Sequence, residues 1–175
     1  MDWKERASVV SALTESLSER LGWCGETQLQ KAVFLLQTVS KVELAYEFTL
    51  DRDGPFSFDL REDLALFRSR DVLRLEPQPV PYGPKYVVSV AGKALDSNQS
   101  AAREIDFVAT KVSRFGAVAL ERLVTALFVT RSMGHDAATE TRVKRFMELK
   151  PQVQAETARI AVEAADEIVR EGARV

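Results

Sequence analysis

The residue types that most often carry nucleophilic chemistry occur once each in this chain, as Cys24 and His135. A cysteine nucleophile needs an imidazole within hydrogen-bond reach and a third group that orients the ring. Cys24 follows Trp23 in a short segment between two expected helices, where a small apolar residue commonly fills a gap in the core. His135 lies in a Gly-His-Asp turn, which favours a solvated ring. We therefore expect no catalytic residues, and an enzyme built on this pair is the less favoured hypothesis.

Carboxylates around Gly54-Pro55 form the second set that could do chemistry: Asp51, Asp53, Asp59, Glu62 and Asp63. Such a set could hold a hard cation or act as paired acid and base. The spacing does not match a calcium loop, because the glycine follows the second aspartate directly and no glutamate closes the loop. Acids at a turn and at the start of a helix are instead favoured by the positive end of the helix dipole. One cysteine and one histidine cannot build a zinc site, and no glycine-rich phosphate loop occurs, so we expect no metal and no cofactor.

Composition narrows the class of protein further. The 175 residues are 46% apolar and 29% charged, which suffices for one core or for two closely packed lobes. Lys and Arg number 24 against 26 Asp and Glu, so no overall field attracts nucleic acid or an anionic membrane. A lone cysteine excludes an intrachain disulfide, and no run of eighteen apolar residues occurs. We therefore expect a cytoplasmic protein without a membrane segment.

The elements that must position these residues can be read from the spacing of apolar side chains. A first helix ends at Gly22, and a second, capped by Thr27, pairs an apolar face with an amide-rich polar face. A strand over 44–50 and a turn at 53–55 follow. A third helix then runs from Ser57 or Asp59 to near Asp71. The polar face of the second helix carries Gln28, Gln30, Lys31 and Gln37.

Two further strands and a helical second half complete the expected fold. Residues 72–75 and 85–90 predict strands joined by a stiff loop, 76–84, that contains four prolines. Helix, strand, helix and hairpin together predict a winged-helix-like N-terminal lobe over 1–97. Residues 98–175 predict a helical lobe packed on it, with a capping box at Thr139 and a helix end before Pro151. The expected class is mostly α with a small antiparallel β element (α+β).

A winged-helix-like lobe raises the possibility of DNA binding. The third helix carries a net charge of −1, which is a poor surface for phosphate. Local contacts would have to come from Arg61, Arg68, Arg70 and Lys85, beside Arg74 and Arg52. Arg142, Lys144, Arg145 and Lys150 form a second candidate patch, or else the solvated face of an amphipathic helix.

A protein partner is the favoured alternative. The proline-rich loop and its neighbouring aromatics would form a preorganised, partly apolar surface, with Phe56, Arg74 and Tyr82 as the expected contacts. The competing interpretation is that Phe56 and Phe58 point inward and pin the turn to the core. The last helix is rich in alanine, which permits close helix packing within the lobe or across the axis of a homodimer.

Four short segments resemble the YwgA-like family of small prokaryotic proteins. They are Gly25–Leu36, Tyr46–Phe48, Gly54–Leu60 and Tyr86–Gly92. More distantly they resemble the Panacea domain of phage-associated and SocA antitoxin-like proteins, although that domain's C-terminal aromatic motif is missing after residue 116. The resemblance implies a compact α-rich fold without established catalysis, which acts through protein contacts in mobile-element, toxin–antitoxin or defence contexts. Together with the residues it predicts a non-enzymatic regulatory or interaction protein, with a winged-helix DNA-binding regulator as the alternative.

Overall fold

The computed structural model describes residues 1–95, 101–134 and 136–175, and it is mostly helical. The predicted class, mostly α with small antiparallel β elements, is confirmed. The helices are α1 (Trp3–Leu21), α2 (Glu26–Val39), α3 (Phe58–Ser69), α4 (Val90–Lys93), α5 (Ala102–Arg114), α6 (Ala117–Met133), α7 (Thr139–Leu149) and α8 (Ala155–Gly172). The strands form two antiparallel hairpins, β1 (Thr49–Asp51) with β2 (Gly54–Phe56) and β3 (Leu73–Glu76) with β4 (Lys85–Val88).

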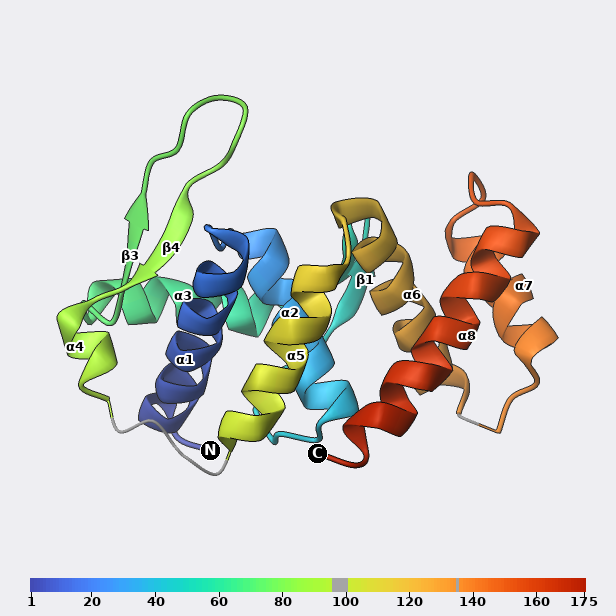
Figure 1. Cartoon of the computed structure of the whole chain (residues 1–175), viewed down its shortest axis with the longest axis horizontal. Coiled ribbons are helices and arrows are strands. Elements are labelled where there is room, and N and C mark those ends of the chain that lie inside the picture. Colours follow the sequence, from blue (N-terminus) through green and yellow to red (C-terminus); the bar gives the residue numbers. More distant parts are fainter. Residues whose placement is uncertain (96–100, 135) are drawn as a thin grey trace.

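Helix α2 lies at the centre of the molecule. It packs against α1, α5 and α6, and α8 in turn packs against α6 and α7 (Figure 1). Eight consecutive residues, 29–36, are buried, so this helix is covered on nearly all sides rather than along one stripe. Elements from both expected lobes therefore share one hydrophobic core. The expected boundary between the lobes, near residues 97 and 98, lies outside the described residues.

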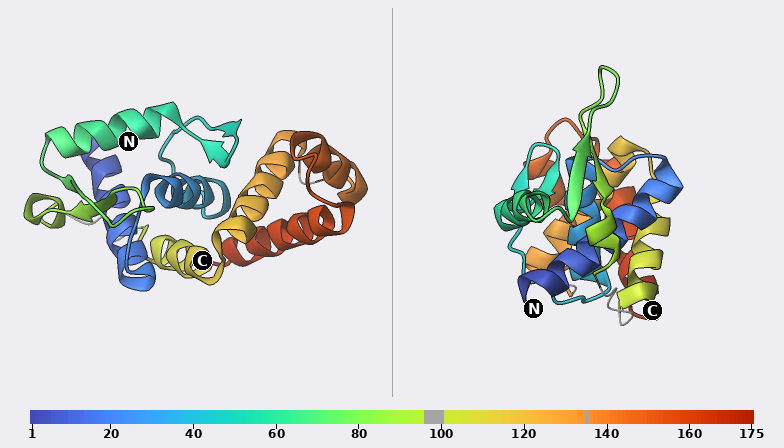
Figure 2. Two further views of the ribbon diagram at one scale, coloured as in Figure 1. Left: turned by 90° about the horizontal axis from the view of Figure 1, so that it is seen from above. Right: turned by 90° about the vertical axis from the view of Figure 1, so that its left-hand side faces the viewer.

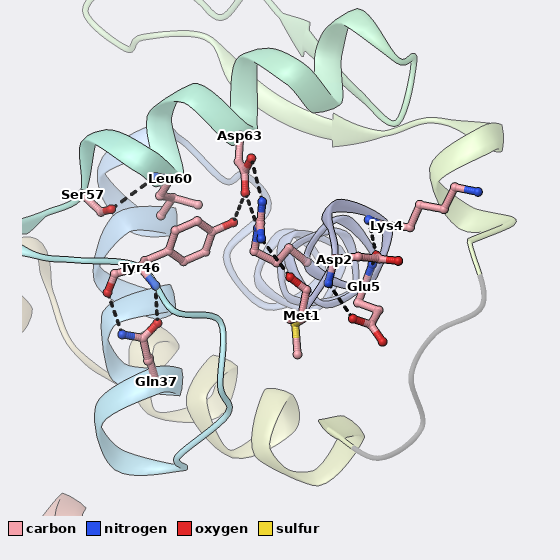
Figure 3. Close-up of polar contacts among 10 residues, drawn as sticks. Met1, Asp2, Lys4, Glu5, Gln37, Tyr46, Ser57, Leu60 and Asp63 are labelled. Carbon is pink, nitrogen blue, oxygen red and sulfur yellow. Dashed lines mark hydrogen bonds and ion pairs between the residues drawn. The ribbon is translucent and has the colours of Figure 1, made fainter.

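The amide-rich face of α2 does not face solvent. The Gln30 side chain accepts from the Ser57 N–H (2.9 Å) and donates to the Ser57 carbonyl (3.0 Å). Gln37 makes the same two bonds to the backbone of Tyr46, at 2.9 and 2.8 Å (Figure 3). Each amide thus replaces a missing strand partner, and together they hold the chain between α2 and α3 against the core.

This arrangement corrects the predicted strand over 44–50. Only Thr49–Asp51 pairs as a strand, while residues 41–48 have no regular structure. Lys41 and Ala45 have positive φ angles of 55° and 62°, which are incompatible with extended pairing. The turn predicted at 53–55 lies one residue earlier, at Arg52-Asp53, because Gly54 and Pro55 belong to the returning strand, which Gly54 starts with φ of 115°.

The local signals for helix ends were right more often than those for helix starts. Gly22 ends α1 in the left-handed conformation, and α7 stops at Leu149, two residues before Pro151. Ser57 caps α3 by accepting from the Leu60 N–H at 3.2 Å. The caps predicted at Thr27 and Thr139 are wrong, because both threonines lie inside their helices and neither start has a side-chain cap.

Candidate functional site

We call the β3–β4 hairpin, residues 73–88, the wing. Its tip carries two of the most exposed apolar residues of the described chain. Its loop extends beyond the body of helices (Figures 1 and 2). Tyr82 is 63% exposed and Val80 is 94% exposed. The four prolines of this loop restrict its conformations, so little entropy would be lost when a partner binds it.

A groove of about 440 Å³ lies at the base of the wing, against the first turn of α2. Trp23, Leu75 and Tyr86 supply its apolar surface, and Glu26 and Arg68 are among its polar residues. The Trp23 ring is tilted against the ring of Tyr82, with 6.4 Å between centroids. The groove and the wing tip therefore form one continuous surface with aromatic anchors and opposite charges, which is the usual composition of an interface centre.

One edge of the wing is open for backbone pairing. The Ser89 N–H donates to the Val72 carbonyl, so these two opposite residues form a hydrogen-bonded pair. In an antiparallel ladder, hydrogen-bonded and non-hydrogen-bonded pairs alternate. Counting along the register, Leu75 and Tyr86 are therefore a pair without hydrogen bonds to each other. Their backbone groups point outward instead. On β4 the outward Tyr86 N–H donates to the Cys24 carbonyl at 2.7 Å, whereas no such bond is recorded for Leu75 within the described residues. The edge of β3 thus offers an unpaired backbone next to the groove.

The structure does not bring the three predicted partner contacts together. Tyr82 lies at the wing tip, and Arg74 lies on the wing face opposite Leu75, where it pairs with Asp71 at 2.9 Å. Phe56 belongs to the β1–β2 hairpin, where it is half-buried and stacks edge-on with Phe58 at 5.1 Å. The inward orientation considered for Phe58 is wrong, because that ring is exposed.

The basic residues proposed for nucleic-acid contact are mostly engaged by acids or rings. Arg61 pairs with Glu26 at 2.8 Å and lies over the Phe56 ring, and Lys85 pairs with Glu76 at 3.2 Å. Arg70 lies over the ring of Trp3 at 5.1 Å. Exposed pairs of this kind are weak, about 0–1 kcal/mol each, but they remove the net positive charge that phosphate needs. Arg68 has no ion pair in the described part of the chain and lines the groove.

The structure divides the second basic patch, near Pro151: Lys144 and Arg145 are exposed, and Arg145 pairs with Glu148 at 2.9 Å, whereas the other two cations are buried. Arg142 is buried and donates to the Asp166 carboxylate at 2.8 Å, and this bond raises the pKa of Arg142. Lys150 is also buried, and its ammonium bonds Glu121 at 2.7 Å and the Arg52 carbonyl. Both alternatives, a phosphate-binding patch and a solvated helix face, are therefore wrong for these two cations.

The thiol candidate is poorly suited to catalysis. Cys24 is completely buried, and burial raises the pKa of its thiol to about 12, so the thiolate is scarce at neutral pH. His135 lies outside the described residues. The packing of Cys24 agrees with the structural interpretation of that residue.

The acidic candidates are dispersed rather than convergent. Asp63 is bonded by the Tyr46 hydroxyl at 2.7 Å and by Arg6 at 2.6 Å, which ties α3 to α1 (Figure 3). Burial, and then the Asp63 carboxylate, raise the pKa of Tyr46. Asp53 lies at the exposed β1–β2 turn, 3.6 Å from Arg52. Within residues 1–95, 101–134 and 136–175, no three of the His, Cys, Asp and Glu side chains lie together as metal ligands.

Two further features bear on partners. The alanine-rich face of α8 packs within the chain, because Ala158, Ala161 and Ala165 are buried in the contacts with α6 and α7. A homodimer stays a prediction.

In the part of the chain that the structure describes, every helix is too short or too polar to cross a membrane.

Comparison of the sequence with protein-family models and with curated proteins returns no match. The family resemblance of the four short segments therefore stays a prediction, and no residue role is taken from it.

Sequence reasoning missed Trp23 and Leu75 as surface residues, because each sits in an ordinary apolar pattern. The signal that was present is the proline-rich loop, which marks Tyr82 as a residue outside the core.

Proposed function

We propose that this chain is a non-enzymatic regulatory protein that binds a protein partner through the wing and the groove at its base. The observation that carries the proposal is the contact of the exposed Tyr82 ring with Trp23, which lines a groove of about 440 Å³. Exposed apolar patches next to a concave site are characteristic of interaction surfaces. A stiff loop and aromatic anchors limit the entropy lost on binding.

The open edge of β3 indicates how a partner would bind. An extended segment can pair with the outward N–H and carbonyl of Leu75 and so add a third strand. Its side chains on the groove side would then lie beside Leu75, and Arg68, which lines the same groove, would select its polar residues. The proposed ligand is therefore an extended, partly apolar peptide segment.

The test is quantitative affinity enrichment from a lysate of the source organism, followed by measurement of the recovered partner with purified proteins. Leu75→Asp places a charge in the groove, and Tyr82→Ala removes the tip aromatic. Ile160→Asp, at a 58% exposed position on α8, is the matched control. We expect the partner's Kd to rise about tenfold or more in both wing variants, as for interface anchors, and to stay unchanged in the control. Equal affinity for all four proteins would overturn the proposal.

The DNA-binding alternative rests on the sequence of helices followed by the wing. Between residues 58 and 89 there are five acidic and five basic side chains, so this surface carries no net charge. Titration of a fluorescent duplex at several salt concentrations tests it directly. Binding that weakens steeply with salt would favour the DNA-binding function, because phosphate contacts release counterions.

The biological setting is part of the same proposal. A reducing cytoplasm suits a chain whose lone thiol is buried. A toxin, nuclease or phage gene beside the coding sequence would support a role in mobile-element, toxin–antitoxin or defence regulation. Neighbouring genes of unrelated metabolism would count against that role without affecting the partner-binding test.

A further inference from the structure

A second cavity lies between α2 and the β1–β2 hairpin, and it shares Glu26 and Thr27 at its edge with the groove. Its volume is about 140 Å³, which is the space of roughly four or five water molecules. Lys31 reaches it from α2, Gly54 and Pro55 line it from the hairpin, and Thr27 lies at its exposed rim. The cavity thus connects a buried amine with the surface.

Lys31 differs from the other buried lysine of the described chain. Lys31 is 6% exposed and Lys150 is 7% exposed. The Lys150 ammonium is bonded by Glu121 and by a backbone carbonyl, as a structural cation normally is. Lys31 makes no hydrogen bond or ion pair with the residues that the structure describes, and it lines the cavity instead. It therefore has the placement of a ligand-binding group rather than that of a structural ion pair.

The charges around Lys31 oppose one another. Burial lowers the pKa of Lys31, because it disfavours the ammonium, and the nearby cation of Lys150 acts in the same direction. The carboxylates of Glu121 and Asp53 act against this effect but do not cancel it. A larger share of neutral amine is therefore present on Lys31 at neutral pH than on an exposed lysine. Neutral amines of buried lysines are nucleophiles toward carbonyl groups.

The rim of the cavity selects the class of ligand. Three acids line the entrance: Glu26 is paired with Arg61, Asp53 lies 3.6 Å from Arg52, and Asp51 forms no ion pair within the described residues. The carboxylate of Asp51 therefore makes the entrance unfavourable for anions. We propose that Lys31 reversibly binds small, uncharged aldehydes or ketones as an imine, a binding site that does not depend on the proposed partner surface.

The bonding change balances without an oxidant or a reductant. The lone pair on the Lys31 nitrogen attacks the carbonyl carbon, and the π pair of the carbonyl moves to oxygen. Both protons of the amine leave with that oxygen as water, and a carbon–nitrogen double bond remains. Hydrolysis reverses the step, so the occupancy of the site follows the concentration of the carbonyl compound.

Reductive labelling of the full chain tests this site. The protein is incubated with acetaldehyde and cyanoborohydride, and the rate of ethylation of each lysine is followed by peptide mass mapping. We expect Lys31 to react at least about threefold faster than exposed Lys41 at pH 7, with the difference closing toward pH 10 as Lys41 loses its proton. Labelling of Lys31 at pH 7 that is no faster than that of Lys150 would overturn the proposal.

Two additions locate the reaction and define the ligand. Thr27→Trp fills the cavity rim without changing charge, and Thr141→Trp is a matched exposed threonine near the start of α7. We expect labelling of Lys31 to fall at least about threefold only in the first variant, and an equal rate in both would overturn the assignment to this cavity. Glyoxylate, an anionic aldehyde, is expected to label Lys31 more slowly than acetaldehyde. Faster labelling by glyoxylate would overturn the uncharged class of ligand.

Discussion

The two hairpins have the same antiparallel topology but opposite surroundings. In the β1–β2 hairpin, Gly54 and Pro55 are buried, and the turn carbonyl of Arg52 is bonded by Lys150, which lies 98 residues further along the chain. The next residue after this hairpin, Ser57, is bonded by Gln30. The first hairpin is therefore part of the scaffold.

The wing is held mainly at its base, where the Tyr86 N–H donates to the Cys24 carbonyl. Toward the tip, the Tyr82 ring contacts Trp23, and the side-chain bond from Gln78 to the Gly83 carbonyl is exposed. The surroundings of a hairpin, and not its own pairing, therefore decide whether it stabilises the fold or remains available to a partner. Matched substitutions in the two hairpins test this difference.

The largest effect is expected for glycine replacement. Gly54 has φ of 115°, and a Cβ there would meet Val124 at 3.2 Å, whereas a Cβ at Gly83 meets nothing within 4 Å. We expect Gly54→Val to lower the free energy of unfolding by about 3 kcal/mol, from strain and overpacking. The matched change Gly83→Val, in open space, should change it by less than about 0.5 kcal/mol. Urea denaturation measures both, and equal losses would contradict the comparison.

The next effect concerns the glutamines. Gln30→Ala leaves the buried Ser57 N–H without a partner and removes one of the two bonds to the Ser57 carbonyl, which still accepts from the Arg61 N–H at 3.2 Å. We therefore expect a loss of about 2 kcal/mol in the free energy of unfolding. Gln78→Ala removes an exposed bond in the wing and should cost less than about 0.5 kcal/mol. Chemical denaturation of both variants at one pH gives the difference. A Gln30 loss as small as that of Gln78 would show that water replaces the amide.

The base of the wing should be sensitive to alkaline pH. The pKa of the Cys24 thiol is about 12 in the folded chain and about 8.5 in the unfolded chain. The neutral buried thiol therefore contributes fully to the free energy of unfolding below a pH of about 8.5, and this contribution is lost as the pH rises toward 12. The slope is at most about 1.4 kcal/mol per pH unit. Buried Tyr46 and Tyr86 act in the same direction at higher pH, so the measurement is the difference between the chain and Cys24→Ala. Parallel curves for the two proteins would contradict it.

The smallest effect on stability is expected at the wing tip. Tyr82→Ala should change the free energy of unfolding by less than about 0.5 kcal/mol, because the ring is mostly exposed. If the proposed interaction is right, the same variant weakens the partner substantially. Thermal melting and partner affinity are measured on one preparation. A destabilised Tyr82→Ala would place this ring in the scaffold and remove the contrast between the hairpins.

Local signals predicted much of the fold. Gly22, Ser57 and Pro151 marked element ends correctly, because each acts through its own backbone or its nearest neighbours. The strand over 44–50 was mostly wrong, because alternation alone does not supply a pairing partner, and Gln37 takes the backbone of Tyr46 instead. The threonine caps failed because the helices begin before or at those residues.

The candidate site was only partly predictable. The proline-rich loop marked Tyr82 as a residue outside the core, and its exposure agrees with that expectation. The groove depends on Trp23 lying beside Leu75 and Tyr86, which are 52 and 63 residues further along the chain, and no local pattern encodes that placement. Phe56 and Arg74 were grouped with Tyr82 by sequence proximity, and the structure separates them.

The helices, the β3–β4 hairpin and the lack of an overall charge field could be predicted from the sequence alone, because periodicity, proline, glycine and composition act locally or as sums. The places of the polar side chains depend instead on the tertiary structure. Gln30, Lys31 and Arg142 all fit the polar face of a helix, and all three are buried. Gln30 and Arg142 have hydrogen-bond partners 27 and 24 residues away, and Lys31 has a cavity formed by a separate hairpin. Burial of a polar group depends on such distant partners, and they come together only when the chain folds.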